Sequence, residues 1–233
     1  MDYTQFNCSI CGSSLQNFKG KIKCFFCEKE FNTNWKCKNN HYICDDCRIA
    51  EPDEIIKIVC KNTSLKNPYK IANKIMSHQS FNNHGIEHHY LVAPVILAAL
   101  KNNKIDIKNN INNRIIAGSI KKIKDIPYGV CGSRGDCGAC VSAGAAMGIV
   151  LKSSYKKASE RSKVLETTSK CLKKLADYGG IRCCKQSVYS AIETFFEIFS
   201  DVNNGIDFEK PICKFSNIIK ICKKDECPYY EKN

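Results

Sequence analysis

The sequence lacks the segments that carry a chain into or across a membrane. Its first residues, MDYTQFNC, contain no cationic region followed by an apolar one, so we expect no signal peptide. The longest apolar run, Leu91 to Leu100, has about half the ~20 residues that a membrane-spanning helix needs. We therefore expect a cytoplasmic protein with no membrane partner.

Motifs for nucleotide binding and internal repeats are missing as well. No GxGxxG follows a strand pattern and no GxxxxGKS/T occurs, so nucleotide-binding folds have no support. With 233 residues the chain is long enough for a sizeable core and for one or two domains.

Acidic residues are too few to balance the basic ones, and the formal net charge is +13. Residues 1–60 hold eight Lys/Arg and eight Asp/Glu, so the whole excess lies in residues 61–233. Thiolates that bind metal would offset part of this charge. A basic face of this kind indicates either an ordinary solvated surface or a contact with RNA or DNA.

Cysteine, in contrast, is abundant, with 17 residues. Thiols stay reduced in the cytoplasm, so cysteine pairs at regular spacing indicate metal or redox chemistry rather than disulfides. Two such pairs come first: Cys8-x2-Cys11 and Cys24-x2-Cys27. Their spacing is that of the two knuckles of a zinc ribbon, and residues 14–23 between them have the alternation and central glycine of a hairpin.

A second ligand set follows directly: Cys37, His41, Cys44 and Cys47. Eight ligands in so short a segment make two structural zinc ions the simplest count, and metal binding would supply much of its folding free energy. The pairing stays open, because Cys24 and Cys27 could instead share an ion with Cys44 and Cys47. We predict a small β-rich double-zinc module, similar to a zinc ribbon, over residues 1–60.

The pattern turns helical in residues 61–233, after a linker at residues 60–68. A helix is expected to begin at Pro68 because Ile71, Ile75 and Met76 fall on one face. Further helices are expected over these ranges: 85–101, 105–123, 138–151, 158–177 and 186–201. The predicted fold class is α+β, with the zinc module on a mainly α-helical body that is rich in cysteine and histidine.

Three of the five histidines lie in HGIEHH, residues 84–89. His84, Glu87 and His88 match His-x-x-Glu-His, in which two histidines hold a catalytic zinc and the glutamate activates water. That motif needs a distal carboxylate, and nothing selects among three candidates: Glu160, Glu166 and Glu193. Gly85 indicates that the motif opens a helix. We expect a site role for these side chains as ligands or acid/base groups, with helix capping as the alternative.

Eight further cysteines occupy loops or helix starts: Cys131, Cys137, Cys140, Cys183, Cys184, Cys213, Cys222 and Cys227. Neighbouring glycines would let the backbone close around a cofactor and donate N–H groups to sulfur, although the spacing is not that of a ferredoxin. We predict that these cysteines pool into one thiolate site facing His84 and His88, with an iron–sulfur cluster as a candidate cofactor. Cys137 and Cys140 could instead be a redox pair, and the remaining alternative is a set of small buried hydrophobes. Cys60 and Cys171 read as ordinary single cysteines.

Several segments together carry a family resemblance: CSICG, CFFC, HYICDDC, HGIEHHYLV, CGSRGDCGAC, GGIRCCK and CPYY. Over nearly its whole length the chain resembles an uncharacterised Cys/His-rich domain family of methane-producing archaea and other anaerobes. Members occur alone or joined to S-adenosylmethionine-dependent methyltransferase domains, so the resemblance implies a methyltransferase as a candidate partner. No methyltransferase motif occurs here, and Ile86 stands where the family usually has proline. The anaerobic setting favours iron–sulfur chemistry.

The predicted function is that of a metal- or iron–sulfur-dependent enzyme in redox or sulfur-transfer chemistry. Its substrate would be a small molecule, a cofactor precursor or RNA. The proposed catalytic residues are His84, Glu87, His88, Cys137 and Cys140. The alternative is a zinc-containing module that binds RNA or a protein partner without catalysis, and the third reading is a metallohydrolase of the His-x-x-Glu-His type.

Overall fold

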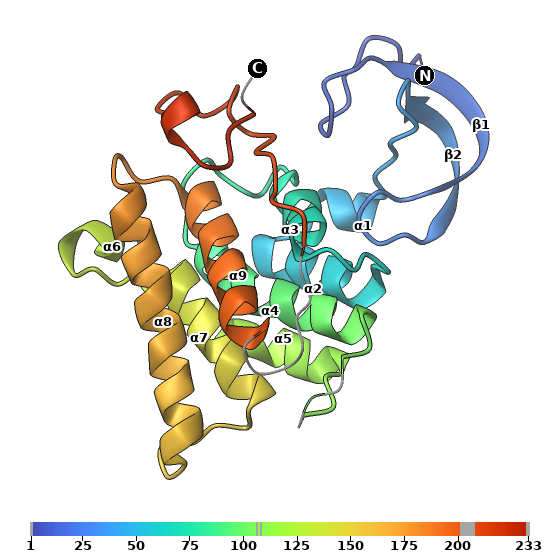
Figure 1. The fold of residues 1–233 in the computed structure, drawn as a ribbon. Helices are drawn as coiled ribbons and strands as arrows, with labels where there is room; N and C mark the ends of the chain where they lie inside the picture. Colours follow the sequence, from blue (N-terminus) through green and yellow to red (C-terminus); the bar gives the residue numbers. More distant parts are fainter. Residues whose placement is uncertain (1, 106, 108, 201–207, 232–233) are drawn as a thin grey trace.

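The computed structural model describes residues 2–105, 107, 109–200 and 208–231. A two-stranded hairpin projects from one side of a helical body, and the C-terminal segment lies near the start of α9 and the end of α8 (Figure 1). The elements, in chain order, are β1 Leu15–Lys23, β2 Glu30–Cys37, α1 Asp45–Arg48, α2 Pro52–Asn62, α3 Pro68–Met76, α4 Glu87–Asn102, α5 Asn113–Lys121, α6 Val130–Ser133, α7 Gly138–Val150, α8 Ala158–Tyr178, α9 Cys184–Ser200 and the 3-10 turn Lys224–Glu226. This architecture confirms the predicted α+β class.

The hairpin is larger than the sequence indicates. Strands β1 and β2 pair antiparallel, from Leu15 opposite Cys37 to Lys23 opposite Glu30. The hairpin predicted within residues 14–23 is therefore wrong, because that stretch is a single strand and the turn lies at residues 24–29. The register shifts between Asn17 and Gly20, so the glycine that suggested a turn marks an irregularity in the strand instead.

Helix α4 forms the centre of the body. Its residues from Glu87 to Leu100 are buried, and it packs against α2, α3, α5, α7 and α9. Helix α7 packs closely on α8 because its side chains are small: a Cβ atom on Gly144 would lie 2.1 Å from the Thr168 hydroxyl. Among the described residues no helix is both long enough and apolar enough to cross a membrane.

Most of the predicted helices are present, with different ends. The helix predicted over 105–123 begins only at Asn113, because the side chain of Asn112 caps it by accepting the backbone N–H groups of Arg114 and Ile115. Residue 201, the predicted end of the last helix, lies outside the described residues. Helix α2 has no counterpart among the predicted helices, although its start carries a capping box between Glu51 and Glu54.

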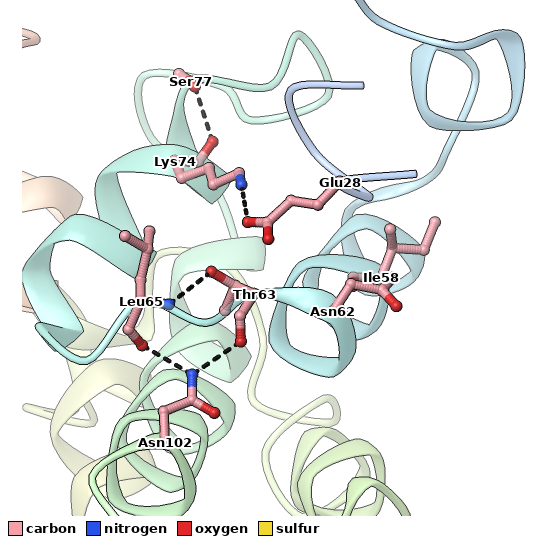
Figure 2. A network of polar contacts seen from close by, with 8 residues as sticks. All are labelled: Glu28, Ile58, Asn62, Thr63, Leu65, Lys74, Ser77 and Asn102. Carbon is pink, nitrogen blue, oxygen red and sulfur yellow. Dashed lines mark hydrogen bonds and ion pairs between the residues drawn. The ribbon is translucent and has the colours of Figure 1, made fainter. Parts of the chain in front are cut away.

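The expected linker is held by the body. The Asn102 amide, at the end of α4, donates to the carbonyls of Thr63 and Leu65 at 2.9 and 2.8 Å (Figure 2). The same figure shows Lys74 of α3 in an ion pair with Glu28 of the hairpin turn, at 2.6 Å. The predicted boundary after residue 60 falls inside α2, and the division into domains stays a prediction.

Candidate metal centres and thiol pockets

The first N-terminal ligand group joins the segment before β1 to the end of β2. Cys8 Sγ lies 3.8 Å from His41 Nδ1, and Cys11 Sγ lies 3.9 Å from Cys37 Sγ. The four ligand atoms all lie within 4.8 Å of one another. Tetrahedral zinc, with Zn–S bonds of about 2.3 Å, holds its sulfur ligands roughly 3.5–4 Å apart. The group therefore has the dimensions of a single-ion site.

The second group lies between the hairpin turn and α1. Its four members are all buried: Cys24, Cys27, Cys44 and Cys47. Cys27 Sγ and Cys44 Sγ are 3.8 Å apart, and all four sulfur atoms lie within 4.8 Å of one another. Both groups could therefore hold metal ions such as zinc.

The ligands of the two groups alternate along the chain. The ribbon pairing of the first two knuckles is wrong, and the interleaved alternative describes the structure. Pairing of Leu15 with Cys37 returns the end of β2 to the first knuckle, whereas the second knuckle lies at the opposite end of the hairpin. The length of the strands thus separates two knuckles that look like neighbours in the sequence.

Backbone N–H groups point at the sulfur atoms of both groups. Ile10 N donates to Cys8 Sγ at 3.4 Å, and His41 N donates to Cys37 Sγ at 3.2 Å. In the second group Cys44 N donates to Cys24 Sγ at 3.4 Å. Such donors stabilise the thiolate form that binds a metal ion.

The second group is anchored to the helical body. His78, after α3, donates a hydrogen bond from Nε2 to the Cys47 carbonyl at 2.6 Å. Phe26, within the second knuckle, packs edge-on against the His78 ring at 4.9 Å between centroids. The second group belongs to the main hydrophobic core, whereas Cys8 and Cys37 form a separate small cluster with Leu15.

The histidine motif opens α4, as expected, and its side chains are held by the surrounding backbone. His84 precedes the helix, and its Nε2 bonds the Arg182 carbonyl at 3.1 Å. His88 Nδ1 bonds the Gly85 carbonyl at 3.2 Å. Among the described residues these histidines do not form a group with metal-site dimensions. The arrangement therefore gives no support to the hydrolase reading.

The side chain of Glu87 makes its contacts within the same turn. Its carboxylate accepts the Asn82 N–H at 3.0 Å and lies 3.4 Å from His88 Nδ1. Burial alone would raise the pKa of Glu87, but these hydrogen bonds hold it below its usual value. Burial lowers the pKa of His88, whose side chain is 1% exposed. Glu87 thus ties the turn before α4 to the start of the helix, and its predicted catalytic role stays a prediction.

Seven of the eight body cysteines line two pockets, and the eighth, Cys140, lines neither. The tail pocket, named for the C-terminal tail that forms one wall, is lined by Cys183, Cys213, Cys222 and Cys227 and encloses about 20 Å³. The α7 pocket is lined by Cys131, Cys137 and Cys184 together with His88, and also encloses about 20 Å³. Cys140 lies behind Cys137 and is fully buried.

One tail thiol of the first pocket repeats a backbone arrangement seen in the N-terminal groups. Cys222 Sγ accepts the N–H of Lys224, two positions later, at 3.4 Å. Cys8 accepts from Ile10 in the same way. The tail itself is held in place by a backbone bond from Cys213 N to the Tyr229 carbonyl at 2.7 Å.

Sequence reasoning missed Gln186 and did not indicate which ring nitrogen of His88 is unpaired. Gln186 Nε2 in the tail pocket and His88 Nε2 in the α7 pocket are buried, and neither has a hydrogen-bond partner among the described residues. Cys171, read as an ordinary core cysteine, contacts Cys140. His88 was singled out as part of the histidine motif, but nothing in the sequence indicates which of its ring nitrogens is unpaired.

Comparison with known proteins identifies the family of the chain but no activity. The family model that matches residues 56–230 is described as a family of unknown function (DUF5714). The chain belongs to this family. The matched range covers about three quarters of the DUF5714 chain and contains all eight body cysteines, whereas the eight N-terminal ligands precede it. No curated protein and no solved structure matches. The predicted uncharacterised family is confirmed, and the link to anaerobes and methyltransferases stays a prediction.

Proposed function

We propose that this DUF5714 protein is an iron–sulfur-dependent redox enzyme whose cluster is held in the tail pocket. The observation that carries the proposal is the convergence of four thiols on one pocket. Cys183 comes from the turn before α9, and the other three come from the C-terminal tail, at least 30 residues further on. Thiolates are the usual protein ligands of iron–sulfur clusters, which need four of them.

The spacing of the thiols favours a cluster over a single ion. Among the described residues only the two N-terminal groups bring their ligand atoms within 4.8 Å of one another. The four tail-pocket thiols line one pocket without approaching one another that closely. A single ion would require them to close in, whereas a polynuclear cluster fills the space between ligands that stand further apart.

Polar groups around the pocket fit a negatively charged, sulfur-rich cofactor. Gln186 Nε2 is an N–H donor that is buried without a partner, and it lines the pocket. Hydrogen bonds to cluster sulfur raise the reduction potential, and a donor left unpaired by the protein is available for one. Lys223 lines the same pocket and Lys185 lies near Cys183 and Cys213, so both offset negative charge.

When bound, an iron–sulfur cluster supplies one-electron transfer. The residues of the chain hold it, donate hydrogen bonds to it and shield it. Tyr189 and Tyr229 form the apolar wall, and their hydroxyls are engaged elsewhere, with Asn73 and Glu193 at 2.5 and 2.6 Å. The wall is thus fixed by its own hydrogen bonds.

The test is anaerobic reconstitution of the full zinc-loaded chain with ferrous iron and sulfide. We expect a visible sulfur-to-iron absorption band and several iron and sulfide ions per chain. Cys213→Ser and Cys227→Ser should lose this iron, whereas Cys60→Ser should retain it, because Cys60 is buried in α2 away from the pocket. Zinc in place of iron, or iron that survives both tail substitutions, would overturn the proposal.

A further inference from the structure

The α7 pocket contains a thiol that the tail pocket does not use. Cys137 is the N-cap residue of α7, a helix of 13 residues, so its sulfur lies at the end of the helix where the first backbone N–H groups have no partner within the helix. Free N–H groups and the helix dipole stabilise a thiolate at this position. Cys140 follows one turn later, so the two form a Cys-x2-Cys pair at a helix start.

His88 supplies a second and independent sign of a ligand. Its Nδ1 bonds the Gly85 carbonyl and therefore carries the ring proton in the neutral form, which leaves Nε2 as an acceptor. That atom is buried, has no partner among the described residues, and belongs to a side chain that is 1% exposed and lines the α7 pocket. A buried acceptor is costly unless something donates to it, and a bound molecule with an N–H group would do so.

We propose that Cys137 and Cys140 are a dithiol that exchanges with a small carboxylate-bearing disulfide bound in the α7 pocket. The Cys137 thiolate attacks one sulfur of the substrate, which forms a mixed disulfide and releases one substrate thiolate. The Cys140 thiol then transfers its proton to that thiolate, and its sulfur attacks Cys137. The products are a Cys137–Cys140 disulfide, one substrate thiol and one thiolate. Two electrons pass from the protein dithiol to the substrate disulfide.

The order of attack follows from the surroundings of the two sulfurs. The Cys140 thiol and the backbone N–H groups lower the pKa of Cys137 to about 6, against the effect of burial. Contact with Cys137 and Cys171, together with burial, raises the pKa of Cys140. Cys137 therefore carries the negative charge and borders the pocket, whereas Cys140 is fully buried and suited to resolve the mixed disulfide.

The class of substrate follows from the rest of the lining. Arg182 stacks on the Tyr128 ring, 4.5 Å from its centroid, and bonds the Tyr128 hydroxyl. Both residues line the pocket, so the guanidinium is held in place with donors to spare for a carboxylate. The enclosed space is about 20 Å³, so the pocket takes one end of a small molecule rather than a folded partner. A disulfide with amine or amide N–H groups and a carboxylate meets both Arg182 and His88 Nε2.

The experiment uses oxidised glutathione as the probe, with the zinc-loaded full chain kept free of iron and oxygen. Modified cysteines are trapped by alkylation and located by mass spectrometry. The unsubstituted chain should accumulate a Cys137–Cys140 disulfide and release two equivalents of thiol. Cys140→Ser should stop at a glutathione adduct on Cys137, Cys137→Ser should form neither product, and Cys60→Ser should behave like the unsubstituted chain.

Rates of alkylation at Cys137 test the same pair without a substitution. The rate should rise with pH around a midpoint near 6, rather than near the ordinary thiol value of about 8.5. Adducts that fall on Cys131 or Cys184 in Cys140→Ser, or a midpoint near the ordinary value, would overturn the proposal. Because no iron is present, neither result depends on the tail pocket.

Discussion

Cys183 and Cys184 are consecutive in the sequence and line different pockets: Cys183 the tail pocket and Cys184 the α7 pocket. Helix α9 begins at Cys184, so Cys183 precedes the helix and Cys184 is its first residue. The proposed cluster site and the α7 pocket therefore have neighbouring residues of the chain in their linings.

Loss of a ligand should destabilise the whole chain in one N-terminal group and only the hairpin in the other. We expect Cys44→Ala to lower the free energy of unfolding of the whole chain by at least about 3 kcal/mol, since its group belongs to the main core and structural zinc contributes folding energy directly. Cys11→Ala should loosen the hairpin alone, because its group packs in the separate small cluster. Thermal unfolding combined with hydrogen exchange distinguishes a global effect from a local one.

Each of these variants should retain one bound metal ion where the unsubstituted chain retains two. Elemental analysis after dialysis measures this directly. A full complement of metal in Cys44→Ala, or an equal loss of stability in both variants, would contradict the expectation.

The contact between α7 and α8 should not tolerate a methyl group at Gly144. Its Cβ would lie 2.1 Å from Thr168 Oγ1, so we expect Gly144→Ala to cost about 1–3 kcal/mol through overpacking. Gly148 is the matched control, because a Cβ there meets nothing closer than 3.4 Å and alanine favours a helix. Denaturant unfolding measures both, and Thr168→Ala should recover part of the loss at position 144.

Glu28 should stabilise the chain through its ion pair with Lys74 and destabilise it through its left-handed backbone. Its φ of 60° is left-handed, and Gly12, which follows the first knuckle as Glu28 follows the second, has φ 72°. Glu28→Gln loses the ion pair with Lys74 and keeps the strain, whereas Glu28→Gly loses both. We expect the glycine variant to be more stable than the glutamine variant by about 1 kcal/mol. Equal stabilities in denaturant unfolding would show that the turn stores no strain.

Acid should destabilise the chain partly through His88. Burial lowers its pKa in the folded state, so below the ordinary histidine value of about 6.5 the unfolded chain binds a proton that the folded chain does not. The free energy of unfolding therefore falls as the pH drops below that value. The slope of the unfolding free energy against pH below that value should be smaller in His88→Phe, by an amount equivalent to up to one bound proton. Above about pH 7 the slope should be unchanged. Unfolding measured across this range, with the same metal content, gives both slopes, and identical acid slopes would contradict the assignment.

The ligand residues of the N-terminal groups could be read from the sequence because CxxC spacing is a local property. Their pairing could not, since it depends on how far β1 and β2 run before the second knuckle returns. Residues 14–23 alternate equally well as one long strand or as two short ones. Only the partner strand, Glu30–Cys37, decides between them.

The start of a helix could be predicted where a single residue can begin it, and could not be predicted where several neighbouring residues could each cap it. Pro68 marks the start of α3, and the structure begins the helix there. The start of α5 lies in an asparagine-rich stretch in which several residues could cap, and only Asn112 does. The division of the body cysteines was also beyond the sequence, because Cys183 and Cys184 are consecutive residues and yet line different pockets.

The alternation of ligands along the N-terminal segment has a consequence for the growing chain. The first four cysteines to be synthesised, at positions 8, 11, 24 and 27, are by themselves a complete set of zinc ligands, yet the folded protein never uses them together. Neither native group is complete before His41, and both are complete at Cys47. An ion that arrives early meets the wrong four sulfurs and must later be handed on, whereas one that arrives after Cys47 finds its final ligands. The timing of metal delivery is therefore built into the order of the cysteines.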